Sequence, residues 1–240
     1  MKARVLAAVA AASLAVTACG PIPPPPPGSL PETAIPVVSP TLTFDWVDTA
    51  DGFTPQERAA VRLRVATCRG WANGSGFILN ENQIITNRHV IRDATRIEIT
   101  TYDGHDYVAV SWLVAPVADL AIVTVDASLE DAATLSTGTL SEGAPVTVVG
   151  YPSGQALVVS DGHYMRDEPD DVEMTMEQVH VFQLPSKQGS SGSAIYDEHG
   201  EVAAILYAGN EATVSLGWQV SWLHALLDGT DSWMPAERSC

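Results

Sequence analysis

The sequence predicts an all-β protein, built either as a sandwich or as a pair of barrels. Almost every apolar run after residue 60 is short and rich in Val, Ile, Thr or Tyr, which is typical of strands. Gly, Asn, Asp and Pro turns separate these runs, and little of this region has the spacing of a helix. The predicted strands are 61–67, 75–79, 83–86, 96–100, 107–113, 119–125, 145–150, 155–160, 180–184, 193–196 and 201–207.

Two helices are predicted in the globular part, which we place at residues 54–240. Thr54 is followed by Pro55, and Glu57 stands three residues after the threonine. This is the pattern of a capping box with proline at the first helical position, so a short helix begins here. Near the C-terminus, "SWLHALL" predicts a second helix with Ser221 as its N-cap.

Residues 1–53 are set apart from this domain. Lys2 and Arg4 precede an apolar run that is too short to span a bilayer, which predicts a secretory signal peptide over residues 1–18. Small residues followed by Cys19 resemble the lipobox of bacterial lipoproteins, which implies a lipid on Cys19; the alternative is a plain secretory signal. Residues 19–53 form a linker that begins with a proline-rich spacer. We therefore expect an exported protein held by its lipid on the outer face of the bacterial cell membrane.

The charge and the cysteines limit the possible partners and bonds. Loss of Lys2 and Arg4 with the signal takes the net charge from −17 to −19, which argues against nucleic acid as a partner. If Cys19 carries lipid, Cys68 and Cys240 remain, and an oxidising compartment lets them form a disulfide. The alternative is two buried thiols.

Candidates for acyl-transfer chemistry are few, because a nucleophilic serine needs a base, a group that orients the base, and donors for the oxyanion. His89 follows the predicted strand "QIIT" in a short turn, where it can lie at the rim of a cleft. Asp119 begins an almost wholly apolar run, and a buried carboxylate there must accept hydrogen bonds. The imidazole is a suitable donor, although capping of local N–H groups is an alternative role. The other histidines lie in polar turns, at a strand start or in the terminal helix: His105, His163, His180, His199 and His224.

The serines of "QGSSGSAI" provide the nucleophile. Gly189 and Gly192 flank Ser190 and Ser191, and Gly189 lets the backbone approach a substrate closely. The N–H groups of Gly189 and Ser191 can point at one oxygen atom, and this register selects Ser191 as the nucleophile.

Four blocks in order give the chain a family resemblance. The first of the four blocks is "GSGFIL" together with "ITNRHVI", and the others are "DLAIVTV", "VGYPSG" and "QGSSGSAI". The chain resembles the trypsin-like serine proteases of the chymotrypsin fold, nearest to the Deg/HtrA branch. The resemblance implies two antiparallel β-barrels and a serine endopeptidase that forms an acyl-enzyme with protein or peptide substrates. It implies that His89 is the general base and acid, that Asp119 orients it, that Ser191 attacks, and that Gly189 and Ser191 form the oxyanion hole. No cofactor is implied, and the chain has no metal-binding motif such as His-Glu-x-x-His.

Two departures from the family pattern affect activity. Many secreted relatives carry an aspartate before the nucleophile that pairs with a newly cut N-terminus, and this chain has Ser190. Either the fold itself or the substrate must then organise the oxyanion loop. We also expect no PDZ domain after the terminal helix. These departures leave open a catalytically silent lipoprotein of the protease fold that binds a peptide or a protein partner.

Substrate preference is predicted from the segments on either side of the nucleophile. By resemblance the pocket lies along "LPSKQ" and "ILYAGN", with Pro185, Tyr207 and Ala208 as its residues. Neither segment is acidic, which predicts a small or medium apolar side chain rather than Lys or Arg. The acidic run 166–178 is predicted to be a solvated loop, with a calcium site or a bias toward basic substrates as alternatives.

Overall fold

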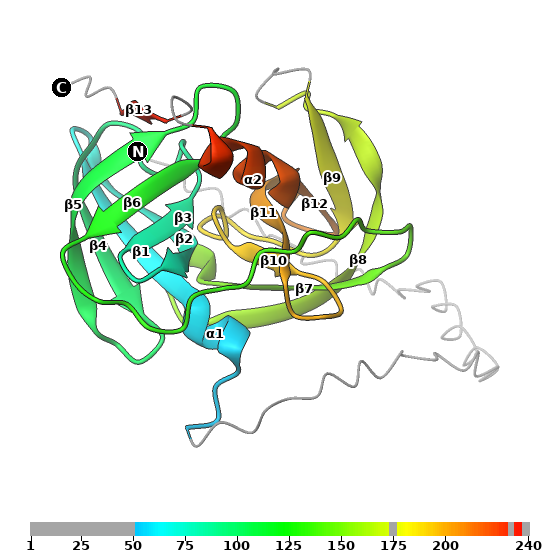
Figure 1. Cartoon of the computed structure of the whole chain (residues 1–240), viewed down its shortest axis with the longest axis horizontal. Coiled ribbons are helices and arrows are strands. Elements are labelled where there is room, and N and C mark those ends of the chain that lie inside the picture. The colour runs from blue at the N-terminus through cyan, green and yellow to red at the C-terminus, as the bar shows by residue number, and fades with distance from the viewer. Residues whose placement is uncertain (1–50, 173–176, 230–232, 237–240) are drawn as a thin grey trace, which may run out of the picture. The chain divides into compact units, whose positions relative to one another are not determined.

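Six antiparallel strands in the first half of the chain close into a barrel (Figure 1). The computed structural model describes residues 51–172, 177–229 and 233–236. The strands pair in the order β5-β4-β1-β2-β3-β6, and pairing of β5 with β6 closes the barrel, while β13 pairs with β5. Their bounds are β1 (Ala60–Thr67), β2 (Gly70–Asn80), β3 (Gln83–Thr86), β4 (Ala94–Thr101), β5 (Asp106–Val114), β6 (Ala121–Val125) and β13 (Met234–Pro235).

A second barrel follows, with the closed order β10-β11-β12-β9-β8-β7. The two barrels confirm the predicted all-β class and the architecture that the resemblance implied. Alternation explains the barrel strands: in β1, Val61, Leu63 and Val65 point into the core, and the arginines between them do not. The bounds are β7 (Pro145–Gly150), β8 (Val158–Pro169), β9 (Gln178–Gln183), β10 (Ala194–Tyr196), β11 (Val202–Gly209) and β12 (Val214–Gln219).

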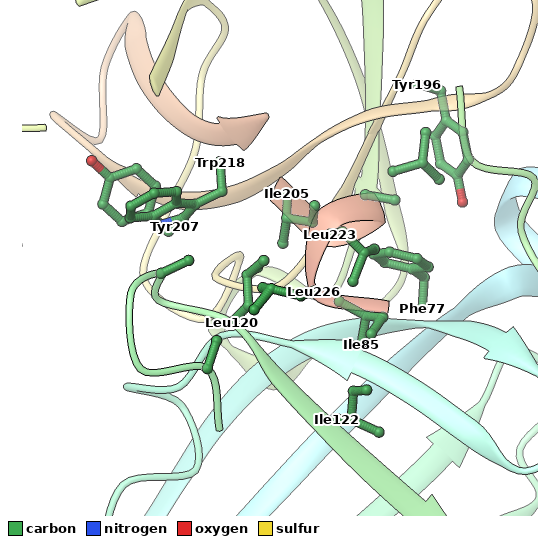
Figure 2. Packing of buried hydrophobic residues seen from close by; sticks show 14 of the residues in the cluster. Phe77, Ile85, Leu120, Ile122, Tyr196, Ile205, Tyr207, Trp218, Leu223 and Leu226 are labelled. Carbon is green, nitrogen blue, oxygen red and sulfur yellow. The ribbon is translucent and has the colours of Figure 1, made fainter. Parts of the chain in front are cut away.

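The two barrels share a hydrophobic cluster. Phe77, on β2, packs in the same cluster as Ile205 and Trp218 of the second barrel, and two leucines of α2 (Val220–Asp228) complete it (Figure 2). Strand β2 is buried without interruption from Gly74 to Ile78, because one face lines the first barrel and the other meets the second. Because the two barrels pack on one core, β2 of the first barrel lies next to loops of the second.

The helices are where the sequence predicts them, with one error. In α1 (Pro55–Ala59), the Thr54 hydroxyl accepts a hydrogen bond from the Glu57 N–H at 3.2 Å, and the Thr54 N–H donates to the Glu57 carboxylate at 2.9 Å. The predicted capping box is confirmed. The N-cap of α2 is Gln219, so the prediction of Ser221 was wrong. Strand β12 continues extended up to Gln219 and turns directly into the helix, which places Ser221 inside the first turn.

The acidic segment is only partly a loop. Strand β8 continues through Pro169 and pairs with β9, and the side chain of Asp170 is buried. The hydroxyl of Tyr207 donates a hydrogen bond to Asp170 Oδ1 at 2.6 Å. The predicted loop is therefore wrong for residues 166–169, which form the end of β8 because β9 offers ladder partners. Arg166, Asp167 and Pro169 are exposed, as predicted, whereas Asp170 is buried and Tyr207 satisfies its carboxylate.

The predicted signal peptide, Cys19, most of the linker and Cys240 lie outside the described residues. Cys68 lies in the turn between β1 and β2. Within the described ranges, no helix combines the length and the apolar character that crossing a membrane would require.

Candidate active site

Strand β3 and the turn that follows it position His89. The turn is closed by hydrogen bonds from the Ile91 N–H to Arg88 O at 3.2 Å and from the Arg92 N–H to His89 O at 3.4 Å. Ile91 is fully buried in the core of the first barrel and anchors the turn. The His89 side chain is 32% exposed, so one edge of the imidazole is open to solvent or to a substrate.

Asp119 binds His89 at two points. The residue lies in the bend before β6, and its side chain is 0% exposed. The His89 backbone N–H donates to Oδ1 at 2.8 Å, and His89 Nδ1 lies 2.5 Å from Oδ2. These contacts give a buried carboxylate the partners that it needs. They also favour a proton on Nδ1, which leaves Nε2 free to act as the acceptor.

Asn87 is hydrogen-bonded to the bend that carries Asp119, a contact that the sequence did not reveal. Its side chain is fully buried, and Nδ2 donates a hydrogen bond to the Asp119 backbone oxygen at 2.8 Å. The bond connects the end of β3 to the bend that carries the carboxylate. Because the partner is a main-chain atom in a distant bend, no residue pattern signals this contact.

The Ser191 loop is a pair of tight turns between β9 and β10. The Ser190 N–H donates to Lys187 O at 2.9 Å, and the Ser193 N–H donates to Ser190 O at 3.0 Å. Gly192 has φ +90°, and a Cβ there would lie 2.1 Å from the backbone oxygen of Ser75. Glycine is required at this position on both counts.

Two backbone amide groups of the Ser191 loop are left unpaired within the described residues, and Gly189 itself is buried. Among the described residues, the N–H groups of Gly189 and Ser191 have no hydrogen-bond partner. The carbonyl of Gln188 accepts from the Ser153 N–H at 2.7 Å. Because the N–H and C=O of a trans peptide point in opposite directions, this bond turns the Gly189 N–H away from Ser153.

The structure joins His89 to Asp119 but does not connect His89 to Ser191. The Ser191 hydroxyl donates to the Tyr207 backbone oxygen at 3.4 Å. Within the described part of the chain, His89 and Ser191 form no hydrogen bond. Rotation about one side-chain bond redirects this hydroxyl, and catalytic hydrogen bonds are often long or misaligned without a substrate.

A pocket of about 380 Å³ adjoins Ser191, and Tyr207 and Ala208 line it. Pro185, the third predicted pocket residue, lines a neighbouring pocket of about 270 Å³. Both pockets include Lys187 and Glu211. The sequence prediction missed Glu211 because it follows the segment "ILYAGN"; its left-handed backbone, with φ +59°, belongs to the turn between β11 and β12.

Two paired antiparallel β-barrels are characteristic of trypsin-like peptidases. The model of the trypsin-like peptidase domain family matches residues 74–205, more than half of the chain, and the chain belongs to this family.

Relatives and solved structures agree with this assignment. The chain is 26% identical to a probable periplasmic serine endoprotease, DegP-like, of Chlamydia trachomatis over 71% of this chain and 33% of the relative. It is also 26% identical to a serine protease of Mycobacterium tuberculosis over 63% of this chain and 40% of the relative. The chain thus spans between a third and two fifths of the length of these two proteins. The active form of a Mycobacterium tuberculosis protease shares the fold, with a TM-score of 0.68 at 21% identity over 76% of this chain and 85% of that one.

Proposed function

We propose that this chain is a serine endopeptidase that cleaves protein or peptide substrates through His89, Asp119 and Ser191. The observation that carries the proposal is the two-point contact between buried Asp119 and His89. A carboxylate that accepts from both the backbone and the ring of one histidine orients a base. The names of the relatives, which describe serine proteases, support the same activity.

In the proposed acylation, the Ser191 hydroxyl attacks the carbonyl carbon of the scissile peptide bond. His89 Nε2 takes the hydroxyl proton, and Asp119 stabilises the imidazolium that results. The carbonyl oxygen becomes an oxyanion and accepts hydrogen bonds from the N–H groups of Gly189 and Ser191. The C–N bond then breaks as His89 gives its proton to the leaving amine.

Deacylation repeats these steps with water as the nucleophile. His89 takes a proton from the water molecule, whose oxygen attacks the ester carbon of the acyl-enzyme. When the tetrahedral intermediate collapses, the bond to Ser191 Oγ breaks and His89 returns the proton to the serine. Both half-reactions require Ser191 Oγ to leave the Tyr207 carbonyl and face His89.

One observation favours a second candidate, a catalytically silent protein that binds a peptide. The Ser191 hydroxyl is bonded to Tyr207 O and not to His89. If that contact persists with a substrate bound, the pocket beside Ser191 holds the peptide without attacking it. The two candidates make opposite predictions for the reactivity of Ser191.

Labelling with a fluorophosphonate separates the two candidates. This probe phosphonylates only a serine that an adjacent base activates. We expect stoichiometric labelling of the folded protein, with the adduct on the peptide that contains Ser191 by mass spectrometry. A folded wild-type protein that stays unlabelled contradicts the peptidase proposal and supports the silent one.

The N-terminus suggests where the enzyme acts. We propose that residues 1–18 are a cleaved signal peptide and that the exported protein is anchored by lipid on Cys19. The order of charged, apolar and small residues before the cysteine supports this. The variant Cys19→Ala should move the protein from the detergent phase to the aqueous phase in detergent partitioning. Unchanged partitioning contradicts the lipid anchor.

A disulfide between Cys68 and Cys240 is the corresponding proposal for the C-terminus. Pro235 of β13 pairs with Leu113, and Ala94 of β4 pairs with Thr67, next to Cys68. The register of β4 against β5 puts both pairs at the same end of the sheet, which supports the bridge. Peptide mapping without reduction should recover the two cysteines in one cross-linked fragment, and two separate thiol peptides contradict it.

A further inference from the structure

We propose that Ser75, on β2 of the first barrel, is a positioning residue that holds the oxyanion loop of the second barrel in its working conformation. The inference rests on the proposed function, because it assigns the Gly189 and Ser191 N–H groups to the oxyanion. It concerns a serine that is not a nucleophile and that lies more than a hundred residues from the loop in sequence.

Ser75 makes three hydrogen bonds to the second barrel. Its hydroxyl donates to the Gly189 carbonyl at 2.9 Å and accepts from the Tyr151 N–H at 2.9 Å. Its backbone N–H donates to the Ser191 carbonyl at 2.9 Å. Ser75 is 0% exposed, so water does not compete for these bonds. One residue therefore holds both the glycine and the serine of the proposed oxyanion hole.

Ser75 is itself fixed from the side of His89. The Thr86 hydroxyl donates to the Ser75 carbonyl at 2.7 Å, and Thr86 is the last residue of β3, before the turn that carries His89. Ser75 and Phe77 lie on the same face of β2, and Phe77 packs in the core that the barrels share. The turn that carries His89 and the oxyanion loop are thus both connected to the same strand, β2, through Ser75.

These bonds determine the direction of the Gly189 N–H. The peptide before Gly189 is held by Ser153, through the Gln188 carbonyl at 2.7 Å, and the peptide after it is held by the Ser75 hydroxyl. Gly189 has φ +88°, and glycine moves between backbone regions more easily than any other residue. Without the Ser75 hydroxyl, the peptide after Gly189 keeps only the local bond from the Ser190 N–H to Lys187 O, and its carbonyl loses the partner from the other barrel.

The position before the nucleophile explains why such a device is needed. Ser190 has no charge to form a buried ion pair, and within the described ranges its hydroxyl accepts a single local bond, from the Lys187 N–H at 3.3 Å. The bonds from Ser75 join residues that are far apart in sequence, and they come from the other barrel. The fold can therefore organise the oxyanion loop without cleavage of a propeptide.

The test compares Ser75→Ala with Ser193→Ala in the full chain. Ser193 is a matched control: it is buried, it lies two residues from Ser191, and its hydroxyl has no hydrogen-bond partner within the described residues. We expect Ser75→Ala to lower kcat for a peptide substrate by about 10²-fold, with KM changed by less than about threefold. Ser193→Ala should stay within about threefold of the wild type in both constants.

Hydrogen exchange gives a readout that does not depend on catalysis. The amides of Ser153 and Ser190 keep their own partners in Ser75→Ala, so faster exchange there reports motion of the loop itself. We expect exchange to rise by about tenfold or more in Ser75→Ala and to stay unchanged in Ser193→Ala. If the wild type neither hydrolyses nor binds the fluorophosphonate, the proposed function fails, and these exchange rates still decide the role of Ser75.

Two further variants separate positioning from general stability. Ile97→Val, in the core of the first barrel, should lower Tm without lowering kcat at temperatures well below Tm. Ser75→Cys keeps a weak donor and acceptor, so it should fall between the wild type and Ser75→Ala, and it replaces Ser75→Ala if that variant does not fold. The inference is overturned if the folded Ser75 variant matches Ser193→Ala in kcat and in exchange. It is also overturned if its loss of kcat is no greater than that of Ile97→Val.

Discussion

Replacing Ser191 with alanine is expected to lower kcat by roughly 10⁶-fold while Tm stays close to that of the wild type. The loss is large because no acyl-enzyme can form without the Ser191 oxygen. Stability should change little, since the hydroxyl makes one long hydrogen bond to the Tyr207 carbonyl. Peptide hydrolysis and thermal melting of the same preparation measure the two effects.

The neighbouring serines provide the control. Ser190→Ala removes a hydroxyl with only a local 3.3 Å contact, and Ser193→Ala removes one without a described partner. Ser190→Ala should keep kcat within about tenfold of the wild type and Ser193→Ala within about threefold, because neither side chain takes part in bond making. Full activity of Ser191→Ala, or loss of activity in Ser190→Ala instead, would show that the nucleophile was assigned in the wrong register.

Replacing Asp119 with asparagine is expected to lower kcat by about 10⁴-fold with little change in shape. The asparagine oxygen can still accept from the His89 backbone N–H, but its amide then faces Nδ1 as a donor. The ring must place its proton on Nε2, and it can no longer accept the proton of Ser191. Asparagine is neutral, so the variant leaves no unpaired carboxylate in the core. The loss of kcat therefore cannot come from an uncompensated buried charge.

Asp197→Asn is the matched control for this prediction. Asp197 is also a buried carboxylate, and it accepts hydrogen bonds from the Ser136 hydroxyl and from backbone N–H groups, with no contact to His89. It should lose stability and keep its kcat. Equal losses of kcat in Asp119→Asn and Asp197→Asn would mean that Asp119 has only a structural role. A peptide substrate assayed well below both melting temperatures distinguishes these outcomes.

Local patterns predicted most of the strands and failed where neighbours decided the structure. Strand β12 was missed because Gly217 interrupts a run that contains Ser and Gln, and it forms because β9 and β11 provide ladder partners on both sides. Strand β8 extends over charged residues for the same reason, since pairing with β9 satisfies its backbone. Asp119 precedes β6 rather than beginning it, because its backbone carbonyl accepts from the Asn87 side chain and not from a neighbouring strand.

By itself, the sequence determined the β-rich class, the first helix and the order of the His, Asp and Ser blocks, because each depends on neighbours along the chain. Only the tertiary structure decided which buried groups hold the loop around Ser191. Ser75 and Gly189 are 114 positions apart, and Asn87 and Asp119 are 32 apart. The first bond exists because two closed barrels share one core, and the second because β3 pairs with β6 inside the first barrel. No local propensity encodes which distant segments these arrangements bring together.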